Sequence, residues 1–582
     1  MNPTKSVNEG VWVVDKSVAL SALTIAPGAS VAAPEGKAVT MTLEGVATAL
    51  KPGTYKGDIF LTISDKLMLT PGGFAAGRAP VEMRAAVFID NGKYVENKSI
   101  PAVVKGGKVT SKATTGATIY GTEDDFNGIL VIGDSEYTVD GVKIDFEGNG
   151  KNDFIGYGAG IAAMGNAKLT IKNSDIRISG WTRCGIHNGG NSVTRVTNCR
   201  ISNFSYPKEG FVPMWALGLS GTNRVNQLCD GATVYYTNCH ISGNGWGALS
   251  IDGGLKVRMY CKDTTIELTG PRARGYGAFS IGDAVILYDH CTLNVQGYPI
   301  LLGGHGDKSD AEITNGTVIN STLYGGMMFR TRGGELKVNK ASVVNSDSST
   351  FVIKGANAYI NVDDAKLNPG NGVILQLQDN DDPGMGPARY MPPCGADLPI
   401  PGRDLSKADP NEDVFMTVSN TEVTGNFFNS TTDLRANQRE KTPELRSGPP
   451  MTPPPGMKLD AVGMQGVKNL DLKLANAKVT GIISAAAAAY KEGLTLIDPS
   501  NSKELSAITQ TAKEPVNTGV IVSLDKDSVW TITGTSYLTS LNLAKGAAIK
   551  APRGKKVTMT VNGAKKEIAS GKYTGNIVLK VA

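Results

Sequence analysis

The sequence has few charged residues and almost no stretch that favours a helix. Asp, Glu, Lys and Arg make up 19% of the 582 residues, below the roughly 25% usual in soluble domains. Glycine, in contrast, occurs 70 times, about twice its ordinary usage. The one clear run of helix-forming residues, 484–491, is short. This composition excludes a helical bundle and is typical of short strands joined by tight corners.

Long apolar runs and basic clusters are also missing. No stretch reaches the length of a membrane-spanning helix. The net charge is only +5, and no Lys/Arg cluster is interleaved with aromatic residues, so we expect no membrane span and no nucleic-acid partner. The N-terminal residues lack the apolar central region of a signal peptide. Either the protein is cytosolic or its sequence begins after a removed leader.

The seven cysteines form no recognisable framework. There is no Cys-x-x-Cys pair and no zinc-like spacing, and the odd total argues against a full set of disulfides. Cys199, Cys239 and Cys291 share one position of the repeat described next, where we expect them to pack inward as small apolar groups. The P-loop, dinucleotide-binding, Gly-x-Ser-x-Gly, His-Glu-x-x-His and EF-hand signatures are absent as well.

What the sequence does contain is a ladder of self-similar segments between about residues 137 and 480. Each has a polar residue, usually Asn or Asp, then a small residue, any residue and an aliphatic one. Successive small residues lie 25, 40, 25, 27, 30, 20, 24, 56 and 56 positions apart, at Ser174, Cys199, Cys239, Thr264, Cys291, Ser321, Ala341, Ala365, Thr421 and Ala477. A period of about 20–50 residues indicates a solenoid, and the long gaps indicate coils that carry insertions.

Stacked coils account for this pattern. The small residue fits a crowded interior column, the aliphatic residue two positions on points inward again, and the polar residue suits a corner. The pattern resembles the right-handed parallel β-helix of the pectate-lyase-like superfamily over roughly residues 120–490. The resemblance implies an all-β, single-stranded right-handed parallel β-helix. The Asn-Thr-Asp and Arg-Ile-Lys patterns of a polygalacturonase are missing. Activity on polyuronates, which is found in the superfamily, is therefore one option for this protein and is not indicated by a motif.

The two ends of the chain are copies of one another. Ala33–Lys37 matches Ala551–Lys555, and Gly53–Ile59 matches Gly571–Ile577, at a constant offset of 518. Such fidelity predicts one β module used twice, either to cap the ends of the solenoid or as a cell-surface or oligomerisation module. The shared pattern is similar to units at the edges of secreted bacterial β-helix proteins. It favours an extracellular or cell-surface location and leaves a cytoplasmic one open.

The chain therefore divides into three parts, with two loops inside the second. Long loops in a compact repeat array are usually functional or disordered; we expect the first loop to cover a site and the second to be mobile. The parts are an N-terminal module with lead-in strands (1–115), the β-helix (116–500) with loops at 379–413 and 430–460, and a C-terminal module (501–582) homologous to 11–63.

The strand that precedes each small residue by about twelve positions ends in polar side chains. Alternation places these side chains on the outside of one face, on coils about 4.8 Å apart. There a histidine can move a proton near neutral pH, an arginine can hold a carboxylate, and aromatic rings can stack on a sugar. The candidates for catalysis are His187, His305, Arg330, Asp252, Asp379 and Asp382. The candidates for substrate binding are Trp181, Trp215, Tyr276, Arg332, Lys354, Gln376, Arg389 and Tyr390.

Two functions fit these features. The first is an enzyme (lyase, hydrolase or isomerase) acting on an acidic or polyhydroxylated substrate, in particular a polysaccharide, with His187 or His305 moving the proton and Arg330 holding the anion. The second is a non-catalytic secreted adhesin or structural β-helix protein. The concentration of polar and aromatic residues in 181–390 favours the first, and the duplicated ends favour the second.

The sequence implies no organic cofactor. Acidic residues at 379–382 leave a divalent cation such as calcium open as a ligand. A capped solenoid is compatible with a monomer, and an exposed flank is compatible with a homo-oligomer.

Overall fold

The protein is all-β, as the repeat predicts. The described residues form strands and a few short 3-10 turns, in two compact units that divide near residue 272. The computed structural model describes residues 2–70, 79–205, 223–270, 274–303, 308–329, 331–378, 380–381, 413–432, 434, 469–495, 497, 501–516 and 518–582.

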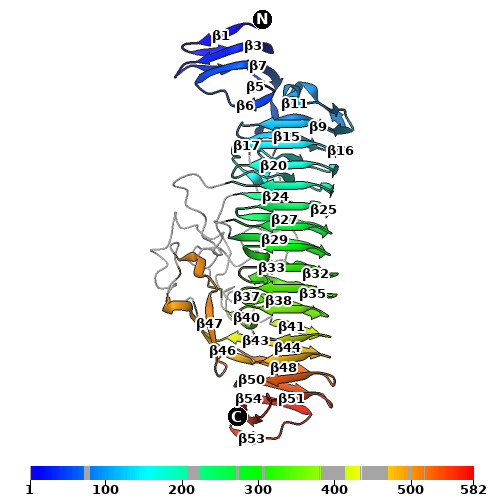
Figure 1. The fold of residues 1–582 in the computed structure, drawn as a ribbon, viewed down its shortest axis with the longest axis vertical. Coiled ribbons are helices and arrows are strands. Elements are labelled where there is room, and N and C mark those ends of the chain that lie inside the picture. Colours follow the sequence, from blue (N-terminus) through cyan, green and yellow to red (C-terminus); the bar gives the residue numbers. More distant parts are fainter. Residues whose placement is uncertain are drawn as a thin grey trace, which may run out of the picture. The chain divides into compact units, whose positions relative to one another are not determined.

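In the first unit each coil adds one strand to each of three parallel stacks (Figure 1). One stack contains β14 (Thr118–Gly121), β17 (Lys143–Glu147), β20 (Asp175–Ser179), β23 (Arg200–Asn203), β26 (His240–Gly243) and β28 (Thr265–Leu268). The second contains β15 (Phe126–Ile132), β18 (Ile161–Ala163), β21 (Ile186–Asn188), β24 (Arg224–Leu228) and the first half of β27 (Gly247–Lys262). The third contains β16 (Glu136–Asp140), β19 (Lys168–Lys172), β22 (Val193–Thr197), β25 (Thr233–Thr237) and the second half of β27.

The second unit repeats this three-stack pattern. One stack contains β30 (Thr292–Val295), β33 (Val318–Ser321), β36 (Val343–Ser346) and β39 (Lys366–Pro369). The second contains the first half of β29 (Gly275–Asp289), β31 (Gly297–Gly303), β34 (Gly326–Phe329), β37 (Phe351–Lys354), β40 (Val373–Gln378), β43 (Asn426–Ser430) and β46 (Ile483–Tyr490). The third contains the rest of β29, β32 (Ser309–Thr314), β35 (Arg332–Asn339), β38 (Asn357–Asp363), β41 (Val414–Ser419), β44 (Leu470–Ala475) and β48 (Val520–Leu524). The predicted parallel β-helix is thereby confirmed.

The polar residue of the repeat forms a left-handed corner. Nine of the ten, among them Asn198 and Asp364, have φ between 47° and 54°, a conformation that Asn and Asp adopt more readily than other non-glycine residues. The small residue that follows is buried at eight of the ten positions, Ala341 and Ala365 being the exceptions. Where it carries a hydroxyl, that group can accept a backbone N–H at the corner of the preceding coil. Thr317 Oγ1, for example, accepts the backbone N–H of Cys291 at 3.0 Å. The repeat thus places a residue that tolerates left-handed φ before one that can accept a hydrogen bond.

Two of the ten predicted anchor positions are wrong. Thr292 pairs with Val318 and Val318 with Val343, so the residues in the anchor column are Thr317 and Ser342 rather than Ser321 and Ala341. Ser342 is buried, whereas Ala341 is exposed at the corner with φ +60°. With this register the irregular gaps of 30, 20 and 24 become 26, 25 and 23, which is the spacing of an uninterrupted coil.

The cysteines of the anchor column behave as small apolar groups. Cys199, Cys239 and Cys291 are buried with free thiols, and Cys199 and Cys239 lie on consecutive coils, because the residues that follow them, Arg200 and His240, are paired. The expectation that they pack inward is confirmed.

The two terminal copies fold in the same register. β3 (Val18–Ile25) pairs with β7 (Gly53–Asp65) as Val18 with Leu61, and β50 (Ser536–Leu543) pairs with β54 (Gly571–Val581) as Ser536 with Leu579. The offset of 518 therefore holds in space as well as in sequence. Their fine structure also agrees. Tyr55 donates its hydroxyl to the carbonyl of Lys51 at 2.8 Å, and Tyr573 does the same to Ala569 at 2.9 Å. The exact limits of the modules stay a prediction.

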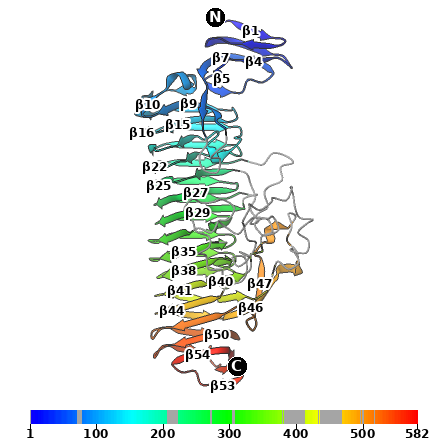
Figure 2. The same cartoon turned by 180° about the vertical axis from the view of Figure 1, so that it is seen from behind.

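An arm leaves the second stack of the second unit, drawn in orange in Figures 1 and 2. β46 pairs antiparallel with β47 (Ile508–Ala512), and the 3-10 turns η9 (Lys491–Gly493) and η10 (Ser502–Glu504) lie between them. The arm has a small apolar core of its own, formed by Leu434, Ala488, Tyr490, Ile497, Leu505 and Ile508. Its remaining contacts are polar.

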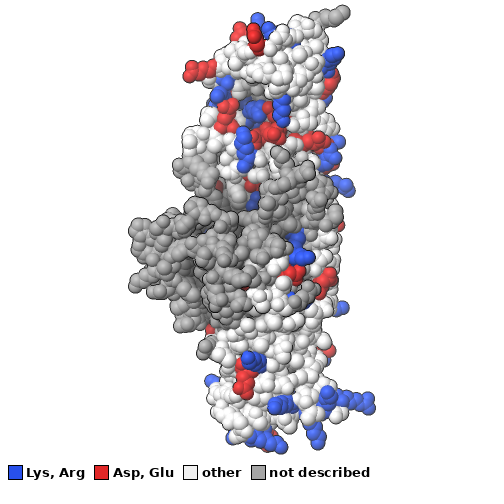
Figure 3. Space-filling model, turned by 90° about the vertical axis from the view of Figure 1, so that its left-hand side faces the viewer, with Lys and Arg blue, Asp and Glu red and all other residues white. Residues whose placement is uncertain are grey.

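The surface reflects the low charge of the sequence. In Figure 3 the described part of this face is largely uncharged, and acidic and basic side chains lie next to one another in its upper part. Within the part of the chain that the structure describes, no helix is both long and apolar enough to cross a membrane.

Candidate functional site

The predicted stripe lies on the second stack, but its described side chains are not exposed. His187, Tyr276, Lys354 and Gln376 are at most 2% exposed, and Trp181 is half-buried. The expectation of an open polar face is therefore wrong for these residues. For Asp252 and Arg332 the structure describes the strand but not the side chain. Outside the described residues lie His305, Arg330, Asp379, Asp382, Trp215, Arg389 and Tyr390.

His187 is covered by a short turn inserted in the preceding coil. The turn, η4 (Asp153–Ile155), begins at Asn152, whose side chain accepts the N–H of Phe154, and ends at Gly156 with φ +75°. A Cβ at Gly156 would lie 2.9 Å from Cδ2 of His187, so only glycine allows the turn to pack this closely. The turn is part of the wall around the ring.

Arg183 holds the same segment against the solenoid. Its guanidinium is fully buried and donates to four backbone carbonyls, including Gly158 at 2.7 Å and Phe126 at 2.8 Å. Burial lowers the pKa of Arg183 to about 10, which leaves it charged at neutral pH. Its contacts are to carbonyls of the chain, so its role is to fix the wall.

The imidazole of His187 is neutral and only half satisfied. Burial lowers its pKa to about 4, and the backbone carbonyl of Asp153 opposes this shift in part. Its Nδ1 is buried and has no hydrogen-bond partner among the described residues. A neutral imidazole has one N–H and one lone pair, so in the tautomer with the proton on Nε2 the Nδ1 atom is a proton acceptor in an enclosed site.

Arg224 joins this site through Asp153. Its Nη1 is 2.6 Å from Oδ2 of Asp153, and its Nε donates to the Ser250 hydroxyl at 2.9 Å. The guanidinium stacks over the ring of Phe154 at 4.7 Å and faces Trp246 at 6.0 Å. Asp153 thus contacts the histidine with its carbonyl and the arginine with its carboxylate. Arginine in such a frame is suited to holding a planar anion.

The indole of Trp246 adds a second unsatisfied polar atom. Its side chain is 6% exposed, and the buried Nε1 has no hydrogen-bond partner among the described residues. Buried polar atoms are nearly always paired, so the unpaired His187 Nδ1 and Trp246 Nε1 each point to a water or ligand group at that atom. No group of three or more metal-binding side chains occurs in the residues that the structure describes.

The second unit buries a different polar cluster. Lys354, at the end of β37, forms an ion pair of 2.5 Å with Asp381, and both side chains are completely buried. Gln376 donates to the carbonyl of Ser506 at 2.8 Å and to Gln378 at 2.6 Å. The stripe residues Lys354 and Gln376 therefore do come together, beneath the arm.

Sequence reasoning missed Asp153, Arg224, Trp246 and Asp381 as members of these clusters. Asp153 lies in an inserted turn with no motif, and Arg224 is the first residue of β24. One signal was available, because the 40-residue gap between Cys199 and Cys239 marks an insertion beside the coil. From the sequence, Trp246 lies near the stripe and can stack on a sugar or aromatic ring, but it is not among the candidate site residues.

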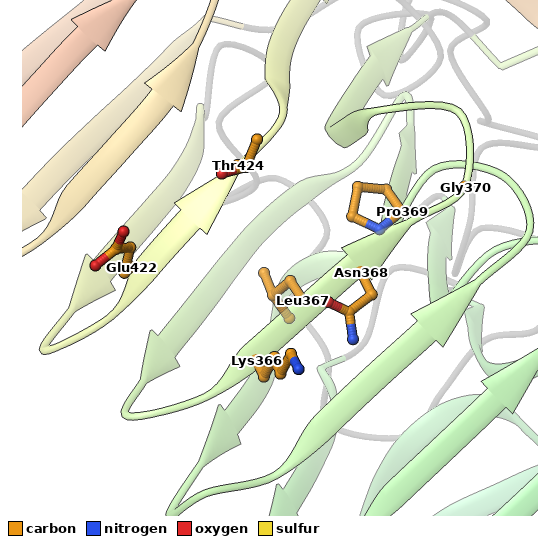
Figure 4. A pocket seen from close by; sticks show the side chains of 7 residues that line it. All are labelled: Lys366, Leu367, Asn368, Pro369, Gly370, Glu422 and Thr424. Atoms are coloured by element: carbon orange, nitrogen blue, oxygen red, sulfur yellow. The ribbon is translucent and has the colours of Figure 1, made fainter.

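A separate pocket of about 530 Å³ lies where one stack is interrupted (Figure 4). β39 ends one sheet and β42 (Glu422–Thr424) begins the next. The lining residues are Lys366, Leu367, Asn368, Pro369, Gly370, Glu422 and Thr424. A ladder of asparagine amides runs up to it, and Asn368 donates to Asn345 at 2.7 Å. Its polar lining is exposed and already solvated, so it is a weaker candidate than the enclosed site around His187.

Comparison with known proteins assigns neither a family nor a function. No protein-family model and no curated protein matches the sequence. Among solved structures the chain is similar to a PL6 alginate lyase in complex with a trisaccharide, at 10% identity and a TM-score of 0.22, over 77% of this chain and 85% of that one. At this level of likeness no residue or activity is carried over.

Proposed function

We propose that this protein is a carbohydrate-active β-helix enzyme that removes a proton from an acidic saccharide. His187 is the base and Arg224 holds the substrate's carboxylate. The observation that carries the proposal is the unpartnered, buried Nδ1 of a neutral histidine whose ring interacts with the carbonyl of Asp153, the residue whose carboxylate pairs with Arg224. Perturbed and unsatisfied groups of this kind concentrate at functional sites.

The proposed step is abstraction of the proton on the carbon next to a uronate carboxylate. The C–H electron pair passes into the carboxylate, and the proton moves to Nδ1 of His187. Arg224 stabilises the dianionic intermediate, taking the carboxylate in place of the Ser250 hydroxyl. Breaking the neighbouring C–O bond then gives a lyase, and returning the proton from the other side gives an isomerase.

Hydrolysis fits the site less well. It usually needs two carboxyl groups placed on either side of the glycosidic bond. Around His187 the structure describes one carboxylate, Asp153, and it is engaged by Arg224. Among the three reaction types that the sequence leaves open, proton abstraction is therefore the one that we propose.

The test compares wild type with His187→Gln and Arg224→Lys on several polyuronates and one neutral polysaccharide. Unsaturated product reports a lyase, and deuterium uptake next to the carboxylate reports an isomerase. His240→Gln is the matched control, because the His240 side chain is 42% exposed and lies 3.3 Å from the Glu267 carboxylate at the surface. Turnover that survives in folded His187→Gln would refute the assignment of the base.

A non-catalytic surface protein is the second candidate, and the duplicated end modules favour it. Two copies in one register are suited to display or assembly. Glycan-array binding by wild type without turnover on any polyuronate would support this alternative. For either function we propose an extracellular or cell-surface location.

A further inference from the structure

The two terminal modules join the solenoid through opposite edges. In the C-terminal copy, β48 pairs with β44, and β49 (Val529–Ile532) pairs with β45 (Lys478–Gly481), so the last coil covers this edge. The equivalent strands of the N-terminal copy are β1 (Thr4–Val7) and β2 (Val11–Val13). Among the described strands, β1 pairs only with β3, and β2 only with β4 (Ser30–Ala32). The N-terminal copy therefore leaves open the edge to which a coil is joined in the C-terminal copy (Figure 1).

The other edge of the module shows the reverse. In the N-terminal copy, β6 (Val46–Thr48) meets the first coil, where Ala47 pairs with Gly121. Its counterpart in the C-terminal copy is β53 (Ala564–Lys566), which pairs with β52 (Val557–Val561). All three residues of β53 are exposed. Each copy of the module thus has one joined edge and one open edge.

At the first open edge, Lys5 occupies a position where the other copy has a buried valine. Lys5 pairs with Leu23 in the N-terminal copy. Val522 pairs with Leu541, which is the counterpart of Leu23 at the offset of 518. Val522 is completely buried and also pairs with Leu472 of the last coil. A lysine in this inward position would carry its charge into the joint between module and coil, and an uncompensated buried charge is costly.

The side chain of Lys5 lies over the open end of the apolar core. Its Nζ is 4.9 Å from the centre of the Trp12 ring, and Trp12 is half-buried against the core of the module. The equivalent Trp530 is completely buried, and its indole N–H donates to the carbonyl of Gly481 in the last coil at 3.0 Å. The lysine thus covers the ring that contacts a coil in the other copy.

The second open edge shows the same exchange of an apolar residue for a lysine. Ala47 pairs with Thr42, and Lys565 pairs with Thr560, at the offset of 518. Ala47 is completely buried, and a Cβ at Gly121 would lie only 3.5 Å from the Cβ of Ala47. Lys565 is exposed. A lysine in place of this alanine would push a neighbouring coil away.

An edge strand with unpaired N–H and C=O groups is a template for pairing with another chain, and natural proteins protect such edges with lysine side chains. The module itself shows that each of its edges can accept a coil. We propose that the two open edges, β1 with β2 and β53, are self-association surfaces for a second molecule of this protein, and that Lys5 and Lys565 keep them closed. This inference concerns the terminal modules and does not depend on the function proposed for His187.

The experiment measures molar mass by light scattering for full-length wild type, Lys5→Val, Lys565→Ala and the double variant over a range of protein concentrations. Wild type should be a monomer. Each single variant opens one edge, and two molecules that pair through the same edge form a closed dimer. We expect the dissociation constant of this dimer to be at least about tenfold lower than that of any wild-type dimer. The double variant should form longer assemblies, because pairing at one edge leaves the other free.

Lys56→Val is the matched control. Lys56 is exposed on β7, which lies between β3 and β5 (Lys37–Leu43), so the same exchange of side chains occurs away from an open edge. This variant should stay monomeric. Association of the control to the same degree as Lys5→Val would show that any added apolar side chain causes it, and would overturn the proposal. Lys5→Val and Lys565→Ala that remain monomeric at every concentration would do the same.

Hydrogen exchange locates the contact in the same samples. Residues 4–13 should gain protection when Lys5→Val associates, and residues 564–566 when Lys565→Ala does; association without this protection would count against the open edges. Valine and alanine already occupy these positions in the other copy, so both variants are compatible with the module. If circular dichroism shows that Lys5→Val does not fold, Lys5→Gln keeps a long side chain without the charge, and it must associate more tightly than wild type.

Discussion

The protein buries two carboxylate–cation pairs and completes them in different ways. Asp381 has a cation on one oxygen and two donors on the other. Asp153 holds Arg224, but the site around that pair retains the unpartnered atoms His187 Nδ1 and Trp246 Nε1. A carboxylate with partners on both oxygens stabilises one arrangement, whereas a site with unpartnered buried atoms gains free energy when a ligand supplies the missing partners. The two sites therefore differ in how the carboxylate and its surroundings are hydrogen-bonded, although both carboxylates are buried.

The largest loss of folding stability is expected when Lys354, the cation of the Lys354–Asp381 pair, is replaced. Lys354→Met removes the cation on Oδ1 of the buried Asp381 carboxylate and should destabilise the second unit by about 3–5 kcal/mol. Urea denaturation, with hydrogen exchange of residues 483–512 to locate the change, measures this. Adding Asp381→Leu to Lys354→Met should restore most of the loss. A loss below about 1 kcal/mol in the single variant would mean that the pair does not hold the arm.

A smaller loss of folding stability is expected at acidic pH, because His187 becomes protonated. His187 has a pKa of about 4 in the folded protein against an ordinary 6.5, so between these values the unfolded chain binds more protons. Stability should therefore fall as the pH drops from about 6.5 to 4, by about 3 kcal/mol in total, and should show no contribution from His187 above that range. Denaturation midpoints at several pH values should show the slope in wild type, and His187→Gln should lack this share of it. An unchanged slope in the variant would contradict the burial of a neutral ring.

Weakening the arginine of the incomplete site should affect binding more than folding. Arg224→Lys keeps the charge but loses the fork that contacts both Asp153 and Ser250 and the stacking on Phe154. Losing one hydrogen bond to a charged group should raise KM about tenfold, equivalent to about 1.4 kcal/mol. Steady-state kinetics on the polyuronate that wild type turns over measures the ratio. An unchanged KM would remove Arg224 from substrate binding.

The smallest change in stability is expected at the exposed ion pair between Glu422 and Lys478. This pair is the reference for the two buried carboxylate–cation pairs. Glu422 and Lys478 are 3.6 Å apart with side chains 75% and 69% exposed. Glu422→Gln should change stability by no more than about 0.5 kcal/mol, because water and salt screen such pairs. Urea denaturation of this variant beside Lys354→Met gives the contrast directly. A loss as large as that of the buried pair would show that the pocket in Figure 4 has a structural role.

The sequence predicted the parts of the fold that repeat. Corner residues such as Asn198 and anchors such as Cys239 could be recognised because each coil imposes the same backbone geometry on them. The anchor was misplaced at Ser321, because Asn320-Ser321 imitates the motif within a strand, four residues beyond the true anchor Thr317. A local pattern does not distinguish a corner from a strand when both contain Asn followed by a small residue.

The candidate site was predictable only in part, because its walls come from segments that do not repeat. His187 and Lys354 could be placed on one face by alternation. Their burial depends on η4 and on the arm, which are separated from them in the sequence and have no periodic signal. Asp381 received no role of its own, since neighbouring carboxylates in the same run look alike until the structure shows which one meets the lysine.

The duplicated ends have a consequence for how the chain folds. In the N-terminal module the β5 (Lys37–Leu43) and β6 (Val46–Thr48) hairpin pairs Met41 with Thr48, and the most distant partners, Val18 and Leu61 of β3 and β7, still lie within the first 61 residues. Each coil of the solenoid instead pairs residues some 23–56 positions apart, and such non-local contacts form slowly. The module can therefore form first during synthesis, and its contact between Ala47 and Gly121 offers the first coil an edge on which to grow. The order of events would run from the N-terminus, coil by coil, until the second copy closes the last edge.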